Sequence, residues 1–425
     1  MSLELSQIHA ALPKGGLYDG GWRYSPEPLT LSKGEMRFIK GLGHPLARFQ
    51  RTCDAIYRRS ASGSLPAWIA EILDTGKPTW MVDLQREAAL GDVFPRIIRP
   101  DLLLGEKGFS LTELDAVPGG LGITAWLSQL YADAGYEVAG GARGMVEGFS
   151  SILDEGGRVL ISEEATDYRR EMEWLVAQAG GGREVSDAEA YQADEKALYR
   201  FFEWFDWMAI PMARSLAERS ASDGLKLSPP CKPHLEDKIW LALLWTPALR
   251  AVWEEMMRGS HLDRIRDLVP FGWIVDPSPL PPQAALPKLD VNSWAEVANF
   301  SQKERELVLK ISGFHETAWG SRGVFVGQDL SKDEWKTRLE AALEDFEQQP
   351  WMMQEFRETR VIEHPVFRED GTVEIMKGRV RLCPYYFTDD DGRTELGGCL
   401  ATIVPADKKK IHGMKDGVLV PVVVG

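Results

Sequence analysis

A pair of short charged segments between residues 99 and 124 constrains this chain most. Arg99 and Asp101 are two residues apart, so both side chains point to one face of an extended segment. Glu113 and Asp115 have the same spacing on a returning strand, and a glycine-bounded turn lies between the two segments. If the strands pair, one face carries three carboxylates and one guanidinium. Charged groups rarely crowd a sheet face without a partner, so this face predicts a site.

Clustered oxygen ligands suit Mg²⁺, which takes one or two carboxylates together with substrate phosphates. The hairpin therefore predicts a metal site made by Asp101, Glu113 and Asp115, with Arg99 beside the anion that the metal also holds. The alternative is a solvated hairpin face with a surface salt bridge. The strand spacing alone leaves both interpretations open.

Charge and cysteine usage exclude some classes of protein. The formal net charge is −15, which argues against sequence-independent binding of nucleic acid, because that needs a basic surface. The four cysteines are scattered and form no CxxC pair, so a reduced, cytoplasmic location is expected. Neither a signal peptide nor a run long enough to cross a membrane is visible, so no membrane partner is expected. The oligomeric state stays open.

Hydrophobic periodicity predicts a mixture of helices and strands. Helices are expected over 33–59, 65–75, 122–135, 163–179 and 331–348, the last with a capping box, and strands over 159–162, 183–185, 306–311 and 351–356. The aromatic run 198–210 is interpreted as buried core at helical spacing, and the segment after residue 372 as mostly antiparallel strands. The strand, helix and glycine stop near 159–185 predict a small α/β unit.

A lysine at a strand end and the loop after it could bind phosphates. Lys310 ends the strand 306–311, and the loop that follows contains Gly320, Ser321, Arg322 and Gly323. A strand lysine can reach nucleotide phosphates, and a glycine-rich loop can bring backbone N–H groups close to them. The segment matches neither the P-loop nor the G-x-G-x-x-G pattern, so the signal is weak by itself.

Three more residues carry weak signals of the same kind. Gln354 and Glu355 lie on a strand, where a carboxyl or amide group could accept a hydrogen bond from an adenine amino group or a ribose hydroxyl. Lys238 follows an acidic pair. The ordinary alternatives are an edge strand and a solvated lysine.

In their order along the chain, these pieces resemble the ATP-grasp superfamily, and specifically its circularly permuted branch that contains the glutathionylspermidine synthetase ligase domain. In that family an R-x-D precedes an E-x-N at the offsets that separate Arg99, Asp101, Glu113 and Asp115 here. The segments E-D-K-I-W-L-A-L-L-W, L-K-I-S-G and W-M-M-Q-E-F are also similar to family segments. The resemblance covers roughly residues 90–425.

The resemblance implies an α+β or α/β fold of ATP-grasp type, circularly permuted, with a small Rossmann-like pre-ATP-grasp lobe. Together with the first ninety residues, which the resemblance does not cover, four domains are expected. These are a mainly helical region over 1–90, the metal-carboxylate hairpin of the core over 91–150, the small α/β lobe over 151–230, and the nucleotide-binding subdomains over 231–425.

The resemblance also implies roles for single residues. It implies that Asp101, Glu113 and Asp115 hold Mg²⁺, and that ATP is bound by Lys238, Lys310, Gly320, Ser321, Gly323, Gln354 and Glu355. Of the two implied catalytic residues, Arg99 binds the transferred phosphoryl or acyl-phosphate group, and Arg322 covers the nucleotide phosphates together with the loop glycines. The chain departs from the family in two places. Asp115 replaces an asparagine, and the loop after Lys310 lacks the usual R-E-G.

The implied activity is that of an ATP- and Mg²⁺-dependent carboxylate–amine ligase that works through an acyl phosphate. Its partners are a small-molecule or peptide carboxylate and an amine. Two alternatives stay open: an ATP-dependent phosphotransferase on the same scaffold, and a non-catalytic nucleotide-binding module.

Overall fold

The chain divides into two compact units, each assembled from separate stretches of sequence. The computed structural model describes all residues except 1, 258, 282–283, 319–321, 409–410 and 412–415. Unit 1 comprises residues 1–47, 87–231 and 359–425, and unit 2 comprises residues 48–86 and 232–358. This division rests on contacts within the fold, so the four domains expected from the sequence stay a prediction.

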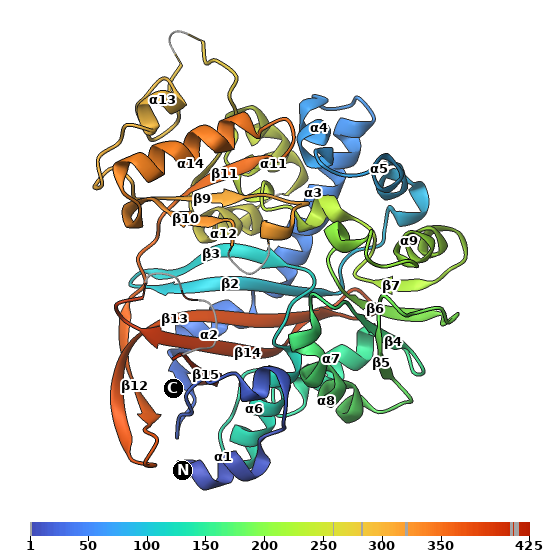
Figure 1. Cartoon of the computed structure of the whole chain (residues 1–425), viewed down its shortest axis with the longest axis vertical. Helices are drawn as coiled ribbons and strands as arrows, with labels where there is room; N and C mark the ends of the chain where they lie inside the picture. The colour runs from blue at the N-terminus through green and yellow to red at the C-terminus, as the bar shows by residue number, and fades with distance from the viewer. Residues whose placement is uncertain (1, 258, 282–283, 319–321, 409–410, 412–415) are drawn as a thin grey trace. The chain divides into compact units, whose positions relative to one another are not determined.

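A large mixed sheet forms the centre of unit 1 (Figure 1). Its order is β1 (Leu29–Leu31), β15 (Val418–Val424), β14 (Thr394–Pro405), β13 (Val373–Thr388), β2 (Ile97–Gly105) and β3 (Gly108–Asp115), and β12 (Val361–Phe367) also pairs with β13. Only the β1–β15 pairing of this described sheet is parallel. The antiparallel region expected after residue 372 is confirmed.

Helices cover this sheet, and a short helical segment of unit 1 packs on the small lobe. The helices of unit 1 outside the small lobe are α1 (Leu5–Ala11), α2 (Lys33–Lys40), α6 (Leu121–Asp133) and α7 (Gly144–Ile152). Helix α6 packs on β14 and β15, and α7 packs on β13 and β14, which lie beside them in Figure 1. A 3-10 turn, η1 (Gly16–Asp19), packs against α8 (Arg169–Ala179) of the small lobe.

The small lobe of unit 1 is a parallel α/β unit, as the sequence predicted. Its described sheet has the order β5 (Glu184–Asp187), β4 (Arg158–Ile161), β6 (Ala197–Phe201) and β7 (Lys226–Ser228), and every pairing is parallel. Helix α9 (Ala213–Ser222) packs on β7. The buried-core interpretation of the first part of the run 198–210 is confirmed, but its helical spacing is wrong, because this part is the fully buried strand β6. A parallel strand covered on both faces is apolar throughout and shows no alternation.

Unit 2 is built on an antiparallel sheet with the order β10 (Val324–Val326), β9 (Leu307–Ile311), β11 (Trp351–Glu355) and β8 (Gly272–Ile274). Its helices include α3 (Gly43–Ala61), which starts just before the unit boundary, α4 (Trp68–Asp74), α5 (Thr79–Arg86), α10 (Trp240–Leu243), α11 (Arg250–Met256), α12 (Ser260–Leu268), α13 (Trp294–Val297) and α14 (Lys332–Glu344). The predicted capping box of α14 is confirmed. The side chain of Ser331 accepts a hydrogen bond from the backbone N–H of Glu334, and the side chain of Glu334 accepts one from the backbone N–H of Ser331.

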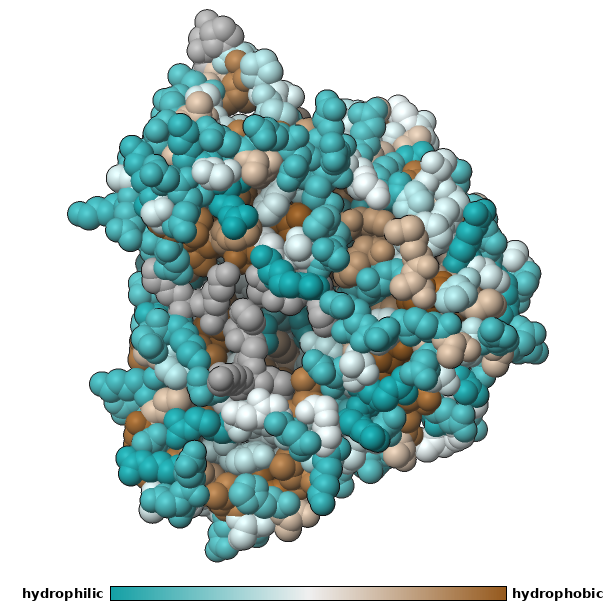
Figure 2. All heavy atoms as spheres, in the orientation of Figure 1, coloured by the Kyte–Doolittle hydropathy of each residue, from teal (hydrophilic) through white to brown (hydrophobic). Residues whose placement is uncertain are grey.

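Hydrophilic side chains dominate the face shown in Figure 2, with apolar side chains in separate patches. The cores lie inside the units; that of unit 2 includes Trp273, Trp294 and Trp335. None of the helices described in the structure combines the length and the apolar character needed to span a bilayer.

Candidate functional site

The charged hairpin exists as the sequence predicted. Strands β2 and β3 pair so that Arg99 lies opposite Asp115 and Asp101 lies opposite Glu113, with a bulge directly after Asp101. The hairpin does not form a solvated face: Asp101 is 4% exposed, and Arg99 and Asp115 are largely buried. The alternative interpretation, a solvated hairpin face with a surface salt bridge, is therefore wrong.

Two arginines neutralise the hairpin's aspartates. Arg99 Nε lies 3.1 Å from Asp101 Oδ1, and another of its nitrogens lies 2.9 Å from Asp115 Oδ2. On the neighbouring strand β13, Arg381 donates to Asp101 Oδ2 at 2.9 Å. Burial opposes ionisation of Asp101, but the charges of Arg381 and Arg99 outweigh it and lower its pKa. Burial raises the pKa of Asp115, and Arg99 offsets only part of that effect.

These carboxylates, as arranged, do not fit a Mg²⁺ site. Both oxygens of Asp101 face guanidinium groups, and Asp115 divides its oxygens between Arg99 and the backbone N–H of Val117. A magnesium ion needs carboxylate oxygens that converge on one point. Across the described residues, no group of three Asp, Glu, His or Cys side chains has that arrangement. The metal role of Glu113 and its neighbours stays a prediction without geometric support.

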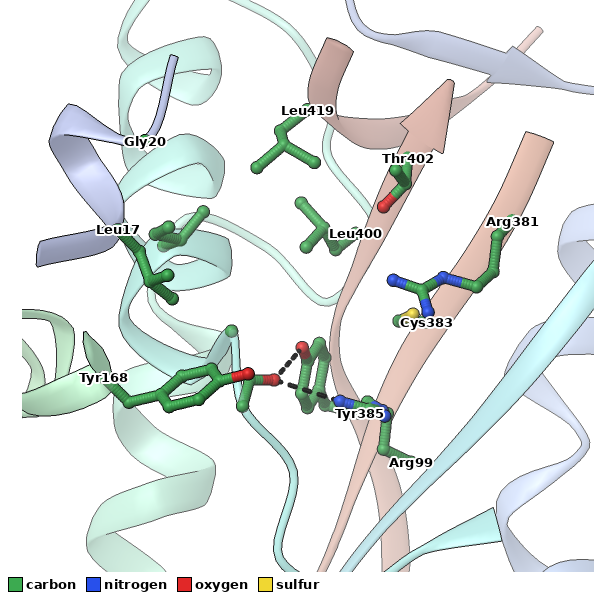
Figure 3. A pocket seen from close by; sticks show the side chains of 13 residues that line it. Leu17, Gly20, Arg99, Tyr168, Arg381, Cys383, Tyr385, Leu400, Thr402 and Leu419 are labelled. Carbon is green, nitrogen blue, oxygen red and sulfur yellow. Dashed lines mark hydrogen bonds between the residues drawn. The ribbon is translucent and has the colours of Figure 1, made fainter. Parts of the chain in front are cut away.

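A cavity of about 330 Å³ opens on the same face of the sheet (Figure 3). Residues 381, 383 and 385 alternate along β13, so their side chains share the face that carries Arg99. The lining combines the cations Arg99 and Arg381, the hydroxyls of Tyr168, Tyr385 and Thr402, the thiol of Cys383, the apolar side chains Leu17, Ile123, Leu400 and Leu419, and three glycines. The predicted residue Arg99 therefore belongs to a pocket whose other walls the sequence did not identify.

The carbonyl of Gly119 ties the pocket's charged and aromatic walls together. It accepts hydrogen bonds from the Tyr385 hydroxyl at 2.7 Å and from Arg99 at 3.3 Å, which Figure 3 shows as dashed lines. A Cβ at Gly119 would lie 2.1 Å from a ring carbon of Tyr168, so glycine is required for this close approach. These bonds fix the orientation of the Arg99 head group.

The N-terminus of α6, which borders the pocket, is capped by Glu171 of α8. Gly120 is the N-cap residue, with a φ of 84° and no side chain to accept from the helix. Glu171 accepts instead from the N–H groups of Gly120 at 2.7 Å and Ile123 at 3.0 Å. Burial raises the pKa of Glu171 to about 7, against the lowering effect of these backbone donors. The N–H groups at this end of α6 are thus used within the protein.

In unit 2, two predicted nucleotide residues lie together. Lys310 on β9 donates from Nζ to Gln354 Oε1 on β11 at 2.8 Å, and both side chains are buried. Glu355 carries ion pairs with Lys288 at 3.0 Å and Arg357 at 2.6 Å. The alternative interpretation of residues 351–356 as an edge strand is wrong, because β11 lies between β9 and β8 in the sheet.

The loop after Lys310 is partly described. Lys238 is half-buried and donates to the carbonyl of Ala318 at 2.7 Å, so it is tied to this loop rather than solvated. Arg322 is exposed and donates to the carbonyl of Glu316 at 2.8 Å. Gly323 is packed so closely that a Cβ would lie 2.2 Å from Ile311. Gly320 and Ser321 lie outside the described residues.

A buried polar network in unit 2 was not foreseen. Asp54 Oδ1 lies 3.1 Å from Lys232 Nζ and 2.9 Å from His234 Nε2. Gln85 Oε1 lies 2.8 Å from His234 Nδ1, and Gln85 in turn donates to the Tyr57 hydroxyl at 2.6 Å. This network joins helices α3 and α5 to the segment that follows residue 231. No spacing rule reveals it, because its members are up to 180 residues apart.

Comparison with known proteins gives a fold and no family. No family model matches the chain, and no curated protein matches it. A glutathione synthetase-like effector from Globodera pallida, solved in its apo form, is similar in structure with a TM-score of 0.57 and 12% identity, over 99% of this chain and 97% of that one. A protein of Methylobacillus flagellatus described as a gamma-glutamylcysteine synthetase covers 92% of this chain and 87% of its own at 12% identity, with a TM-score of 0.35 that supports no conclusion. The mixed α/β fold is thus one that a glutathione synthetase-like protein also has.

Proposed function

We propose that this protein is an ATP-dependent carboxylate–amine ligase. The observation that carries the proposal is the pocket with Arg99 and Arg381, which offers two guanidinium groups to a carboxylate in a mostly buried setting. The fold likeness to a glutathione synthetase-like protein supports it. We extend the proposal to the circularly permuted ATP-grasp arrangement and to ADP as a product.

The proposed reaction has two steps. A carboxylate oxygen of the acid attacks the γ-phosphorus of ATP, the bond to ADP breaks, and an acyl phosphate forms. The amine then attacks the acyl carbon, phosphate leaves with the bonding electrons, and the amine's proton passes to phosphate or solvent. Arg99 binds the transferred phosphoryl or acyl-phosphate group and stabilises the charge that develops during its transfer, and Lys310 contacts the nucleotide phosphates.

The remaining predicted residues take supporting roles in this proposal. Lys238 joins Lys310 at the phosphates, while Gln354 and Glu355 border the adenine. Arg322, with Gly320, Ser321 and Gly323, covers the phosphates. Mg²⁺ enters with the nucleotide, whose phosphates it binds, and no step is assigned to an ion held by the hairpin.

A release assay tests the proposal. ADP and phosphate should appear only when an acid and an amine are both present with Mg-ATP. Release with the acid alone would indicate the phosphotransferase alternative. Absence of turnover across a pool of acids and amines, despite ATP binding, would reject the ligase proposal.

Lys310→Met and Lys336→Met form a matched pair of variants for the nucleotide site. Lys310→Met removes the buried charge and should weaken ATP binding, measured by calorimetry, by roughly 10- to 150-fold, the range of a charged hydrogen bond. Lys336→Met, on the exposed face of α14, is the control and should leave ATP affinity unchanged. Equal affinities for the two variants would remove Lys310 from the nucleotide site.

A non-catalytic binding module is the second candidate. The engagement of Asp101 and Asp115 favours it, because each oxygen of these two carboxylates already accepts from a donor within the chain. In that case ATP or the acid binds but no ADP forms under any combination of substrates.

A further inference from the structure

Arg381 and Thr402 form an unsatisfied polar pair in the wall of the pocket. They are directly opposite each other on the antiparallel strands β13 and β14, so their side chains are neighbours on one face. Among the described residues, Arg381 Nε and Thr402 Oγ1 are buried without a hydrogen-bond partner. Figure 3 shows both side chains at the cavity. Buried polar groups normally have partners, so this pair is arranged for an acceptor from outside the chain.

The acceptor that fits this pair is a carboxylate. Arg381 uses one terminal nitrogen for Asp101, at 2.9 Å, which leaves Nε and part of the fork for a second acceptor. A carboxylate oxygen can accept from Arg381 while also accepting from the Thr402 hydroxyl. Cys383, which also lines the pocket, adds no negative charge, because burial raises the pKa of its thiol to about 12.

The rest of the wall is unsuited to a cationic group. The pocket's described lining contains neither Asp nor Glu, whereas two guanidinium groups face it. The nearby Asp101 and Asp115 are already paired with these arginines, so the ammonium group of an amino acid would lie in this partly buried space without a free counter-ion. Opposite the charged end, Leu17, Leu400 and Leu419 supply an apolar surface.

We infer that the pocket takes a small monocarboxylic acid with an apolar body and no amino group. Its carboxylate binds Arg381 and Thr402, and its hydrocarbon part packs on the leucines. A cavity of about 330 Å³ suits a ligand at the small end of the usual range. That this acid is also the group activated by ATP rests on the proposed function; its binding does not.

A pair of ligands with one carbon skeleton tests the inference. The probes are 4-methylpentanoate and leucine, which differ by the α-ammonium group, titrated by calorimetry into the full chain without nucleotide. The acid should bind at least tenfold more tightly than leucine. Equal affinities for leucine and 4-methylpentanoate would overturn the inference. It would also be overturned if inorganic phosphate displaced the bound acid at a concentration lower than the acid needs for binding.

Thr402 supplies the diagnostic variant. Its hydroxyl has no partner in the described structure, so Thr402→Val should leave the melting temperature unchanged while weakening the acid by about three- to tenfold, the range of one hydrogen bond. Thr402→Ser should retain most of the affinity. Ser128→Ala, which removes another buried unpartnered hydroxyl outside the pocket, is the control and should bind as the parent does. An unchanged affinity in folded Thr402→Val would refute the assignment.

The inference and the proposed function fail separately. If 4-methylpentanoate binds as expected but no ADP forms with any amine, the pocket assignment stands and the ligase proposal falls. If ADP forms only with a zwitterionic acid, and 4-methylpentanoate does not inhibit that reaction, the ligase proposal stands and the inference falls.

Discussion

Arg99 compensates two buried carboxylates at once, so its loss should leave one carboxylate unpaired and weaken the compensation of the other. Arg99→Met leaves Asp115 without its ion pair and Asp101 with Arg381 alone. We expect a loss of about 3 to 5 kcal/mol in the free energy of unfolding, measured by urea denaturation. The exposed pair of Arg214 with Glu218 is the comparison, and Arg214→Met should lose less than about 1 kcal/mol. Similar losses for both variants would contradict the buried network.

His364 should make stability depend on pH. The ring is buried on β12, its Nε2 has no described partner, and burial lowers its pKa from 6.5 to about 4. The unfolded chain therefore binds the proton first as the pH falls, and stability decreases between about pH 6.5 and 4 by about 3 kcal/mol, then levels off. His364→Leu should remove that part of the slope in urea titrations, whereas His9→Gln, at an exposed position, should not. A parallel slope in His364→Leu would exclude this histidine.

Sequence spacing identified one side of the pocket and missed the other for a physical reason. Arg99, Asp101, Glu113 and Asp115 could be assigned to one face because a two-residue period and a glycine turn determine a hairpin locally. Arg381 and Thr402 depend on pairing between distant strands and on a bulge between Tyr385 and Tyr386, which resets the register. Local spacing contains no such information.

At the scale of elements, the capping of α6 by Glu171 of α8 can be tested directly. Glu171→Gln preserves shape but turns one acceptor into a donor that faces the backbone N–H groups of Gly120 and Ile123. We expect a loss of about 1 to 3 kcal/mol in unfolding free energy, the cost of an unsatisfied buried group. Glu173→Gln on the same helix removes only surface pairs with Arg169 and Arg170 and should change little. A neutral Glu171→Gln would show that α6 does not need this acceptor.

Elements with a local sequence signal were predicted, and the strand β6 was not. The helix α14 was found from its capping box and apolar stripe, and the hairpin β2–β3 from its turn. The strand β6 was mistaken for helical core because every residue in it is buried, which erases the two-residue alternation. Burial on both faces therefore hid the strand character of β6, whereas β4, which is also buried, was recognised from its short apolar run.

On the scale of the whole molecule, each unit is discontinuous in sequence. Residues 232–358 place Lys232, His234 and Asp237 in the interior, and their partners Asp54, Gln85 and Lys77 come from residues 48–86. The aromatic stacking of Trp253 on Phe49 joins the same two stretches. Neither stretch alone satisfies these buried groups.

A fragment experiment follows from this discontinuity. The fragment 232–358 should show no cooperative thermal transition by circular dichroism, because its buried charges lack partners. Joining 48–86 to it through a flexible Gly/Ser linker should restore the transition. Asp54→Leu in the joined fragment is the control and should weaken it again. A cooperative transition in 232–358 alone would show that the first stretch is dispensable.

The pairing of β2 with β13 also sets an order of events during synthesis on the ribosome. Asp101 and Arg381 are 280 residues apart, so the hairpin leaves the ribosome long before its partner strand. At usual translation rates that interval is roughly 15 to 55 seconds. During that interval, the carboxylate face of the hairpin is open to other chains and to chaperones. The segment that carries β13, β14 and β15 both completes the central sheet and supplies Arg381 and Thr402 to the pocket, so a product that stops before it lacks the pocket as well as the sheet.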